Sequence, residues 1–178
     1  MQKILVHSCC GPCSTYSLKM LKDSGFDVTS LFYNPNIHPY TEHSLRKEAF
    51  RSFSQQAGYK AIIEESYGLK YFMDTVKDFC YDRKARCVAC YRMRLSKTAK
   101  LAKEIGIDAF STTLTISPYQ DHEAIERVGL EVGSELGVEF CYFDFRDGYR
   151  ESIQMSLDMG LYRQKYCGCI FSEEERYS

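Results

Sequence analysis

Cysteine is the residue type most able to do chemistry in this chain, and its distribution is uneven. Seven of the nine cysteines fall in three short groups, separated by long stretches with few thiols. A disulfide framework spreads its cysteines more evenly, so this grouping is typical of metal ligation or redox chemistry. The isolated Cys80 and Cys141 are expected to be inert small side chains. The candidate metal ligands are Cys9, Cys10 and Cys13; Cys87 and Cys90; and Cys167 and Cys169.

Two of the groups have Cys-x-x-Cys spacing, at Cys10 and Cys13 and at Cys87 and Cys90. Zinc and iron–sulfur clusters both use thiolates at this spacing, and four thiolates satisfy either of them. Spacing alone therefore does not choose between the metals. Seven grouped thiols exceed four, and the surplus indicates a second metal, a redox pair or ligand exchange. A purely structural zinc site needs none of these, so the excess favours catalytic iron–sulfur chemistry.

Positive charge is concentrated beside the second and third cysteine groups. Residues 83–103 contain eight basic side chains and no acidic one, whereas the whole chain has a formal net charge of −1. A basic run is often only a solvated helix face, but this one includes two thiols, which favours an anionic substrate. Tyr162 and Tyr166 alternate with cations near the third group, as in proteins that stack on extruded bases. The candidate RNA contacts are Arg83, Arg86, Arg92, Arg94, Lys97, Arg163 and Lys165.

The composition limits the class of protein. With 178 residues, 44% hydrophobic and 26% charged, the chain fits a soluble globular protein, and we expect one domain over residues 1–178. No apolar run reaches the roughly 18 residues needed to cross a bilayer, and the apolar run within residues 1–7 is too short for a signal peptide. We therefore expect no membrane partner and a cytoplasmic location, where thiols stay reduced and free for metals.

Short apolar runs alternate with helical patterns, which predicts an α/β Rossmann-like fold, a parallel sheet with helices on both faces. The expected strands are 3–6, 26–33, 61–63, 108–114 and 138–143; the expected helices are 69–79, 87–105, 118–136 and 151–162, with two earlier ones that start at Ser14 and Thr41. With the strand order 3-2-1-4-5, the loops after the first and fourth strands line one crevice, where such folds bind ligands. The first loop has a single glycine, Gly11, and no glycine-rich phosphate cradle, which argues against bound ATP or NAD.

Four motifs, in order along the chain, resemble the QueH family of epoxyqueuosine reductases: His7-Ser8-Cys9-Cys10-Gly11-Pro12-Cys13, Cys87-x-x-Cys90-Tyr91-x-x-Arg94-Leu95, Thr112-Thr113-Leu114 with Ser117-Pro118-Tyr119, and Tyr162-Arg163-Gln164-x-Tyr166-Cys167-Gly168-Cys169. The resemblance implies a HUP-like Rossmann domain and a cobalamin-independent enzyme for the last step of queuosine synthesis, acting on epoxyqueuosine in the anticodon of tRNA. It also implies a [4Fe–4S] cluster, an additional iron nearby and an external electron donor. The resemblance further implies either cysteine or aspartate at position 13, and because this chain has Cys13, its ligand set for the additional iron is expected to differ from that of the relatives with aspartate.

The reaction that this resemblance implies turns an epoxide into an alkene, which takes two electrons and two protons and releases the oxygen as water. We expect Cys87, Cys90 and two other thiols to hold the cluster, and the remaining thiols to bind the second iron or to serve redox turnover; the partition stays open at this point. The candidate catalytic residues are Cys10, Cys13 and Tyr119, and the candidate proton donors are Tyr119, Tyr166, His7 and Asp121.

Two other functions fit parts of the pattern. A zinc-stabilised RNA-binding module without catalysis would also use a basic helix and Cys-x-x-Cys pairs. A tRNA thiolation enzyme of the related ATP-pyrophosphatase kind would need the glycine-rich loop that the sequence lacks. Iron and sulfide content separates the RNA-binding module from the reductase, and dependence on ATP separates the thiolation enzyme from it.

Overall fold

In a computed structural model that describes residues 1–178, five strands form one all-parallel sheet in the order β3-β2-β1-β4-β5. The central strand pairs on both sides, with Ile4 opposite Val28 in one neighbour and opposite Ala109 in the other. The predicted Rossmann-like fold and its strand order are confirmed, and the sheet changes its direction of growth between β1 and β4. The strands are β1 (Lys3–His7), β2 (Asp27–Phe32), β3 (Lys60–Ile63), β4 (Ala109–Thr112) and β5 (Glu139–Phe140).

Seven α-helices and two short 3₁₀ helices accompany the strands, and the last three of these nine follow β5. None of them combines the length and the apolar composition that a bilayer-spanning segment needs. In chain order they are α1 (Gly11–Asp23), α2 (Tyr40–Ala57), α3 (Leu69–Val76), α4 (Arg83–Glu104), η1 (Thr113–Ile116), α5 (His122–Leu136), η2 (Arg146–Gly148), α6 (Tyr149–Asp158) and α7 (Ile170–Tyr177).

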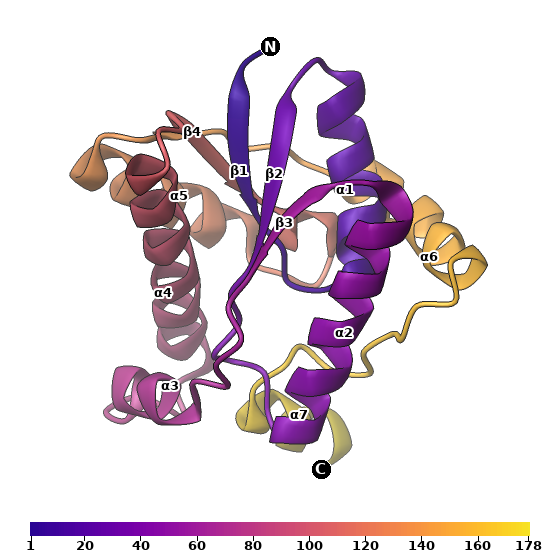
Figure 1. Cartoon of the computed structure of the whole chain (residues 1–178). Coiled ribbons are helices and arrows are strands. Elements are labelled where there is room, and N and C mark those ends of the chain that lie inside the picture. The colour runs from indigo at the N-terminus through magenta and orange to yellow at the C-terminus, as the bar shows by residue number, and fades with distance from the viewer.

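Helices cover both faces of the sheet (Figure 1). On one face lie α1 and α2, with α6 packed against α1; on the other lie α4 and α5. Because successive strand residues point to opposite faces, Ile4 and Val6 join the core under α1 and α2, whereas Leu5 joins the core under α4 and α5. Burial on both faces explains why β1 is a continuous apolar run.

Two further helices, α3 and α7, lie beyond the carboxyl ends of the strands, at the lower end of the molecule in Figure 1. They pack with part of α4 in a third, smaller core that contains Phe72, Met93 and Phe171. Cys90 and Cys169 belong to the same core. Two candidate metal ligands therefore lie in an apolar cluster that ties α4 to the C-terminal segment.

The first helix begins earlier than predicted because a thiol caps it. The sulfur of Cys10 accepts a hydrogen bond from the backbone N–H of Cys13, and α1 starts at Gly11 instead of after Ser14. At Gly11 the backbone runs so close to α2 that an added Cβ would lie 2.8 Å from the carbonyl oxygen of Ala49. Packing between the two helices therefore requires a residue without a side chain at this point.

Several other element ends differ from their predicted positions. Asp82 caps α4, which begins four residues earlier than predicted, and Asp121 caps α5, which begins four residues later. The helix predicted to start at Thr41 starts one residue earlier, at Tyr40, and has no side-chain cap. The fifth strand is only two residues long, and the helix predicted at 151–162 ends at Asp158. Helix α7, which follows the third cysteine group, was not predicted.

Candidate metal centre

The loops that follow β1 and β4 meet where the order of the sheet reverses. The two strands pair in parallel with His7 opposite Thr112, so both loops leave the same edge of the sheet. The backbone N–H of Cys9 donates a hydrogen bond to the Thr113 hydroxyl (3.2 Å), and that hydroxyl donates to the Cys9 sulfur (3.5 Å). The first cysteine group therefore lies in the predicted crevice at the carboxyl ends of the strands.

Cys9, Cys10 and Cys13 form a compact thiol triad in that crevice. Their sulfur atoms all lie within 4.8 Å of one another, with 3.8 Å between Cys9 and Cys10. Because Cys10 is the N-cap of α1, the positive end of that helix faces the triad. Three soft donors at this separation are placed to bind one metal ion and leave a further coordination position open.

One member of the thiol triad ionises more readily than the other two. Hydrogen bonds from the Cys10 and Cys13 thiols, with another from Thr113, hold the pKa of Cys9 well below its ordinary value. Burial raises the pKa of Cys10, and hydrogen bonding to Cys10 and Cys9 raises the pKa of Cys13. The triad on its own thus favours a single thiolate at Cys9, and a bound cation is needed to deprotonate all three thiols.

The other four thiols form a second set, here named the four-thiol group: Cys87 and Cys90 on α4 with Cys167 and Cys169 of the C-terminal segment. Burial raises the pKa of Cys87 and takes that of Cys90 to about 12. Negative charge on Cys167 and Cys169 adds to both shifts, so the four lie within electrostatic range of one another. The Cys169 sulfur accepts a hydrogen bond from the Ser172 N–H (3.3 Å) and caps α7.

Two glutamines join the loops that carry these thiols. The side-chain amide of Gln164 donates to the Cys10 sulfur (3.3 Å) and lies 3.7 Å from the Cys13 sulfur. The amide of Gln120, which follows η1, donates to the Cys167 sulfur (3.4 Å). The C-terminal segment is thus hydrogen-bonded both to the first cysteine group and to the loop after β4. Neither glutamine was predicted, although Gln164 lies within the fourth sequence motif.

Arg46 on α2 holds the C-terminal segment in place and was also not predicted. Its terminal nitrogens donate to the carbonyl oxygens of Cys167 (2.7 Å) and Tyr166 (2.9 Å), and its Nε pairs with Glu42 (2.7 Å). The other carboxylate oxygen of Glu42 accepts a hydrogen bond from the Tyr162 hydroxyl (2.7 Å). Arg46 is 2% exposed, so these bonds form where water competes little with them. The only local signal for this cluster is the four-residue spacing between Glu42 and Arg46.

Two of the predicted RNA contacts, Arg86 and Arg94, are buried, each 2% exposed. Arg86 donates to the Glu175 carboxylate and to the Cys80 carbonyl oxygen, both at 2.7 Å. Arg94 donates through Nε to the carbonyl oxygen of Cys90 (3.2 Å). The structure therefore gives both arginines partners inside the protein, away from the surface where a phosphate would bind.

The other five predicted RNA contacts keep exposed surface. Arg92 forms ion pairs with two glutamates of α5, which compensate its charge. Lys97 lies over an aromatic ring, 5.7 Å from its centroid. Arg83 is 3.9 Å from a glutamate oxygen, and Arg163 and Lys165 have no carboxylate oxygen within 4.0 Å. Arg163 and Lys165 are therefore the cations near the third cysteine group whose charge the protein leaves uncompensated.

His7 is buried and has both ring nitrogens engaged. Its Nε2 faces two acceptors, the carbonyl oxygen of Tyr33 and the amide oxygen of Asn34, each at 3.1 Å, which assigns the proton to Nε2. Its Nδ1 then accepts from the Thr112 hydroxyl (3.0 Å). Burial, together with the charge of Arg94, lowers the pKa of His7 to about 4. A neutral histidine thus links the ends of β1, β2 and β4.

The other candidate proton donors differ in what their polar groups contact. The Asp121 carboxylate caps α5, and the Tyr166 hydroxyl donates to the carbonyl oxygen of His38. Tyr119 is 79% exposed, and its ring packs edge-on against Tyr149 with 6.3 Å between centroids. The Tyr119 hydroxyl makes no hydrogen bond to the protein. Among the four candidates, it is the one whose polar group has no partner within the protein.

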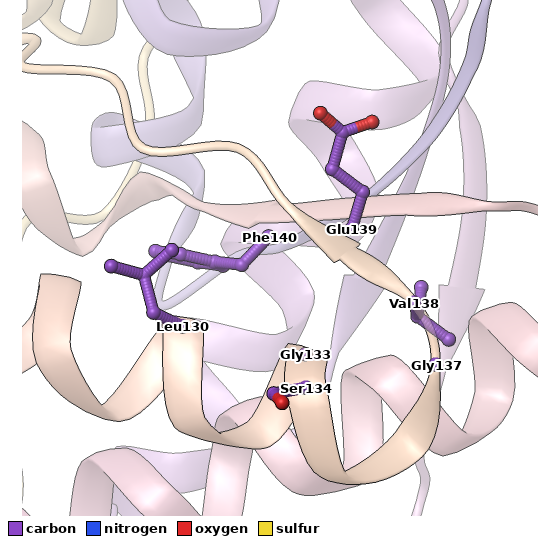
Figure 2. Close-up of a pocket in the computed structure, with 7 residues that line it drawn as sticks. All are labelled: Leu130, Gly133, Ser134, Gly137, Val138, Glu139 and Phe140. Atoms are coloured by element: carbon purple, nitrogen blue, oxygen red, sulfur yellow. The ribbon is translucent and has the colours of Figure 1, made fainter.

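A separate surface hollow of about 430 Å³ lies between the end of α5 and β5, with Leu130 and Phe140 in its wall (Figure 2). Glu139, at its rim, accepts a hydrogen bond from Gln2 at the amino end of β1. The hollow is therefore at the opposite end of the sheet from the thiols. Neither a thiol nor an imidazole lines it, so it offers no soft-metal ligand.

Comparison with known proteins identifies the family of this chain. The family model described as epoxyqueuosine reductase QueH matches residues 4–175. Proteins of that name are 42% identical to this chain in Dehalococcoides mccartyi, over 98% of this chain and 94% of that protein, and 35% identical in Thermotoga maritima, over 99% and 93%. Among solved structures, this chain is similar to the crystal structure of a predicted subunit of tRNA methyltransferase from Methanocaldococcus jannaschii, with a TM-score of 0.57 and 14% identity. The match covers 89% of this chain and 76% of that one, and it shows a shared fold. Over nearly all of its length, with a triad of thiols at the switch point of the sheet, the chain belongs to the epoxyqueuosine reductase QueH family.

Proposed function

We propose that this chain reduces epoxyqueuosine in tRNA to queuosine. The epoxide takes up two electrons and two protons, both of its C–O bonds break, a carbon–carbon double bond forms and the oxygen leaves as water. An external one-electron donor supplies the electrons in two steps. The proposal is supported by family membership and, above all, by the thiol triad at the switch point of the sheet, to which the segment that carries Cys167 and Cys169 is hydrogen-bonded through Gln164.

In this proposal the four-thiol group holds a [4Fe–4S] cluster and the thiol triad holds the additional iron. A cluster uses four thiolates and needs more room than a single ion, which suits thiols drawn from α4 and the C-terminal segment. Sulfur atoms within 4.8 Å of one another suit a single ion and leave a position for a substrate oxygen. When bound, these groups supply single electrons and a Lewis acid for the epoxide oxygen.

The protein's own residues orient the thiols and supply a proton. Gln164 and Thr113 fix the triad sulfurs through hydrogen bonds. Tyr119 donates one of the two protons to the departing oxygen. The location of Tyr119 supports this role, because burial and the charges of Tyr119 and Cys13 raise the pKa of the neighbouring Tyr149. Tyr149, whose ring packs edge-on against that of Tyr119, is thus within electrostatic range of both the exposed phenol and the triad.

Exposed cations near the centre bind the tRNA backbone. Arg163 and Lys165 have no carboxylate partner, so their full charge is available for phosphate. Arg83 and Lys97 add exposed positive charge along α4, and Arg92 contributes less because two glutamates already compensate its charge.

Metal analysis and turnover together test the proposal. Anaerobically purified protein is expected to contain iron and sulfide and to have broad visible absorption that bleaches on reduction. With a strong one-electron reductant it should convert epoxyqueuosine-containing tRNA to queuosine-containing tRNA without ATP. A colourless zinc protein that binds tRNA but leaves the epoxide intact would instead be the zinc-stabilised RNA-binding module. Iron-loaded protein without turnover would refute the assigned reaction.

A further inference from the structure

Arg94 carries a buried positive charge that no carboxylate balances. It lies in the middle of α4 and is 2% exposed, and no carboxylate oxygen comes within 4.0 Å of its nitrogens. Its Nε donates to the carbonyl oxygen of Cys90, and its guanidinium lies 5.8 Å from the centroid of the Tyr91 ring. Its two terminal nitrogens make no hydrogen bond to the protein. Burying a charge is costly unless an opposite charge lies nearby, so a counter-charge of another kind is required.

The neighbours of Arg94 identify that counter-charge. Burial acts to lower the pKa of the Arg94 guanidinium, but negative charge on Cys90, Cys167, Tyr91 and Cys9 together outweighs it and leaves the pKa above its ordinary value. Cys90 and Cys167 belong to the four-thiol group, and Cys9 belongs to the thiol triad. Arg94 is therefore within electrostatic range of both sets of thiols. A thiol that coordinates a metal is deprotonated outright, which supplies the missing negative charge.

The second buried arginine of α4 provides a contrast. Arg86 is equally buried and is also within range of thiols, since charges on Cys169 and Cys87 contribute to the pKa of its guanidinium. It has its own counter-ion in Glu175 at 2.7 Å. The charge of Arg86 is thus neutralised within the protein, and the charge of Arg94 is not.

We propose that Arg94 is a positioning residue whose fixed positive charge balances the metal-bound thiolates and makes the centre easier to reduce. This inference rests on the proposed function, because it requires an iron–sulfur cluster in the four-thiol group. One-electron reduction adds one negative charge to the cluster while all thiolate bonds stay in place, and the electron comes from the external donor. A cation buried beside the thiolates stabilises the reduced state more than the oxidised one, since charge near a cluster is one of the terms that set its potential.

The test is the midpoint potential of the cluster, measured by anaerobic dye-mediated titration. Arg94→Gln removes the charge, Arg94→Lys keeps it, and Lys100→Gln removes an exposed charge from the same helix as a matched control. We expect Arg94→Gln to favour the oxidised state at least tenfold, which is about 59 mV toward more negative potential for a one-electron couple. Arg94→Lys should recover most of that shift, and Lys100→Gln should leave the potential close to that of the unmodified protein.

If Arg94→Gln does not retain the cluster, its potential cannot be measured. Iron and sulfide content then reports the loss of the cluster, and far-ultraviolet circular dichroism shows whether the variant is folded. Loss of the cluster in folded Arg94→Gln but not in Arg94→Lys would support the proposal, because Lys keeps the positive charge that Gln removes. Equal loss in both folded variants, or an unchanged potential in Arg94→Gln, would overturn it while leaving the reductase function intact. Unmodified protein that binds no iron would overturn the proposed function and this inference together.

Discussion

Replacing Arg46 tests whether one buried cluster on α2 positions the thiols of the C-terminal segment. Arg46→Met removes three hydrogen bonds, to Glu42 and to the carbonyl oxygens of Tyr166 and Cys167. Glu42, whose side chain is 11% exposed, then keeps only its bond from Tyr162. Removing one partner of a buried ion pair typically costs about 3–5 kcal/mol. In a chain of this size each kcal/mol lowers the melting temperature by roughly 2–4 °C, so we expect a fall of about 6–20 °C.

Urea denaturation of the reduced, metal-free protein measures this cost. Arg51→Gln is the matched control, because Arg51 lies on the same helix and its pairs with Glu48 and Glu65 are exposed; such pairs contribute about 0–1 kcal/mol. The double variant Glu42→Leu with Arg46→Met should recover the part of the loss that comes from the stranded carboxylate, but not the part that comes from the loop carbonyls. If Arg46→Met costs no more than Arg51→Gln, the cluster does not hold the segment as described.

Three further predictions concern the metal, pH and RNA. Cys87→Ala should lose most of its iron and sulfide whereas Cys141→Ala, outside both thiol sets, should keep them; a full metal complement in Cys87→Ala would refute the ligand assignment. Burial, with the charge of Lys47 nearby, lowers the pKa of His43 from its ordinary value of 6.5 to about 4. The unfolded chain therefore binds a proton at this histidine more readily than the folded protein does. Its contribution to stability is fully present above pH 6.5 and is lost as the pH drops from 6.5 toward 4. The unmodified protein should therefore lose about 2 kcal/mol more unfolding free energy than His43→Gln between pH 7 and pH 5; parallel pH profiles would contradict this. Replacing both Arg163 and Lys165 with Gln should lower the slope of log Kd for tRNA against log salt concentration by roughly 2. An unchanged slope would show that these two residues do not contact the tRNA backbone.

The sheet was predictable from the sequence because its strands are buried on both faces. Continuous apolar runs such as that of β1 predict central parallel strands, and the helices between them require crossover connections, which gives the observed order. The ends of elements were harder to predict, for two different reasons. Asp121 was available as an N-cap for α5, but Pro118 also suits a helix start. Cys10 and Cys169 act as N-caps through sulfur, which is not among the preferred capping groups.

The location of the thiols followed from topology, but their partners did not. Gln164 and Arg46 contact residues more than a hundred positions away in the chain, and no local pattern encodes such contacts. The burial of Arg86 and Arg94 did leave a signal. These two arginines and Cys90 are spaced four residues apart along α4, so they lie on one helix face, and a cysteine expected to bind metal inside the fold marks that face as the inner one.

The positive end of α1 explains how a phosphate-binding architecture accommodates sulfur. In Rossmann-like folds the first loop and the N-terminus of the following helix usually bind a phosphate brought by the ligand. Here the thiol of Cys10 occupies the cap position, and Gly11 serves close packing against α2. Cys169 holds the equivalent cap position on α7. Helix N-termini favour thiolates for the same reason that they favour phosphates. Both helices therefore begin at a sulfur cap, and at α1 a side chain of the protein itself occupies the place where a ligand phosphate usually binds.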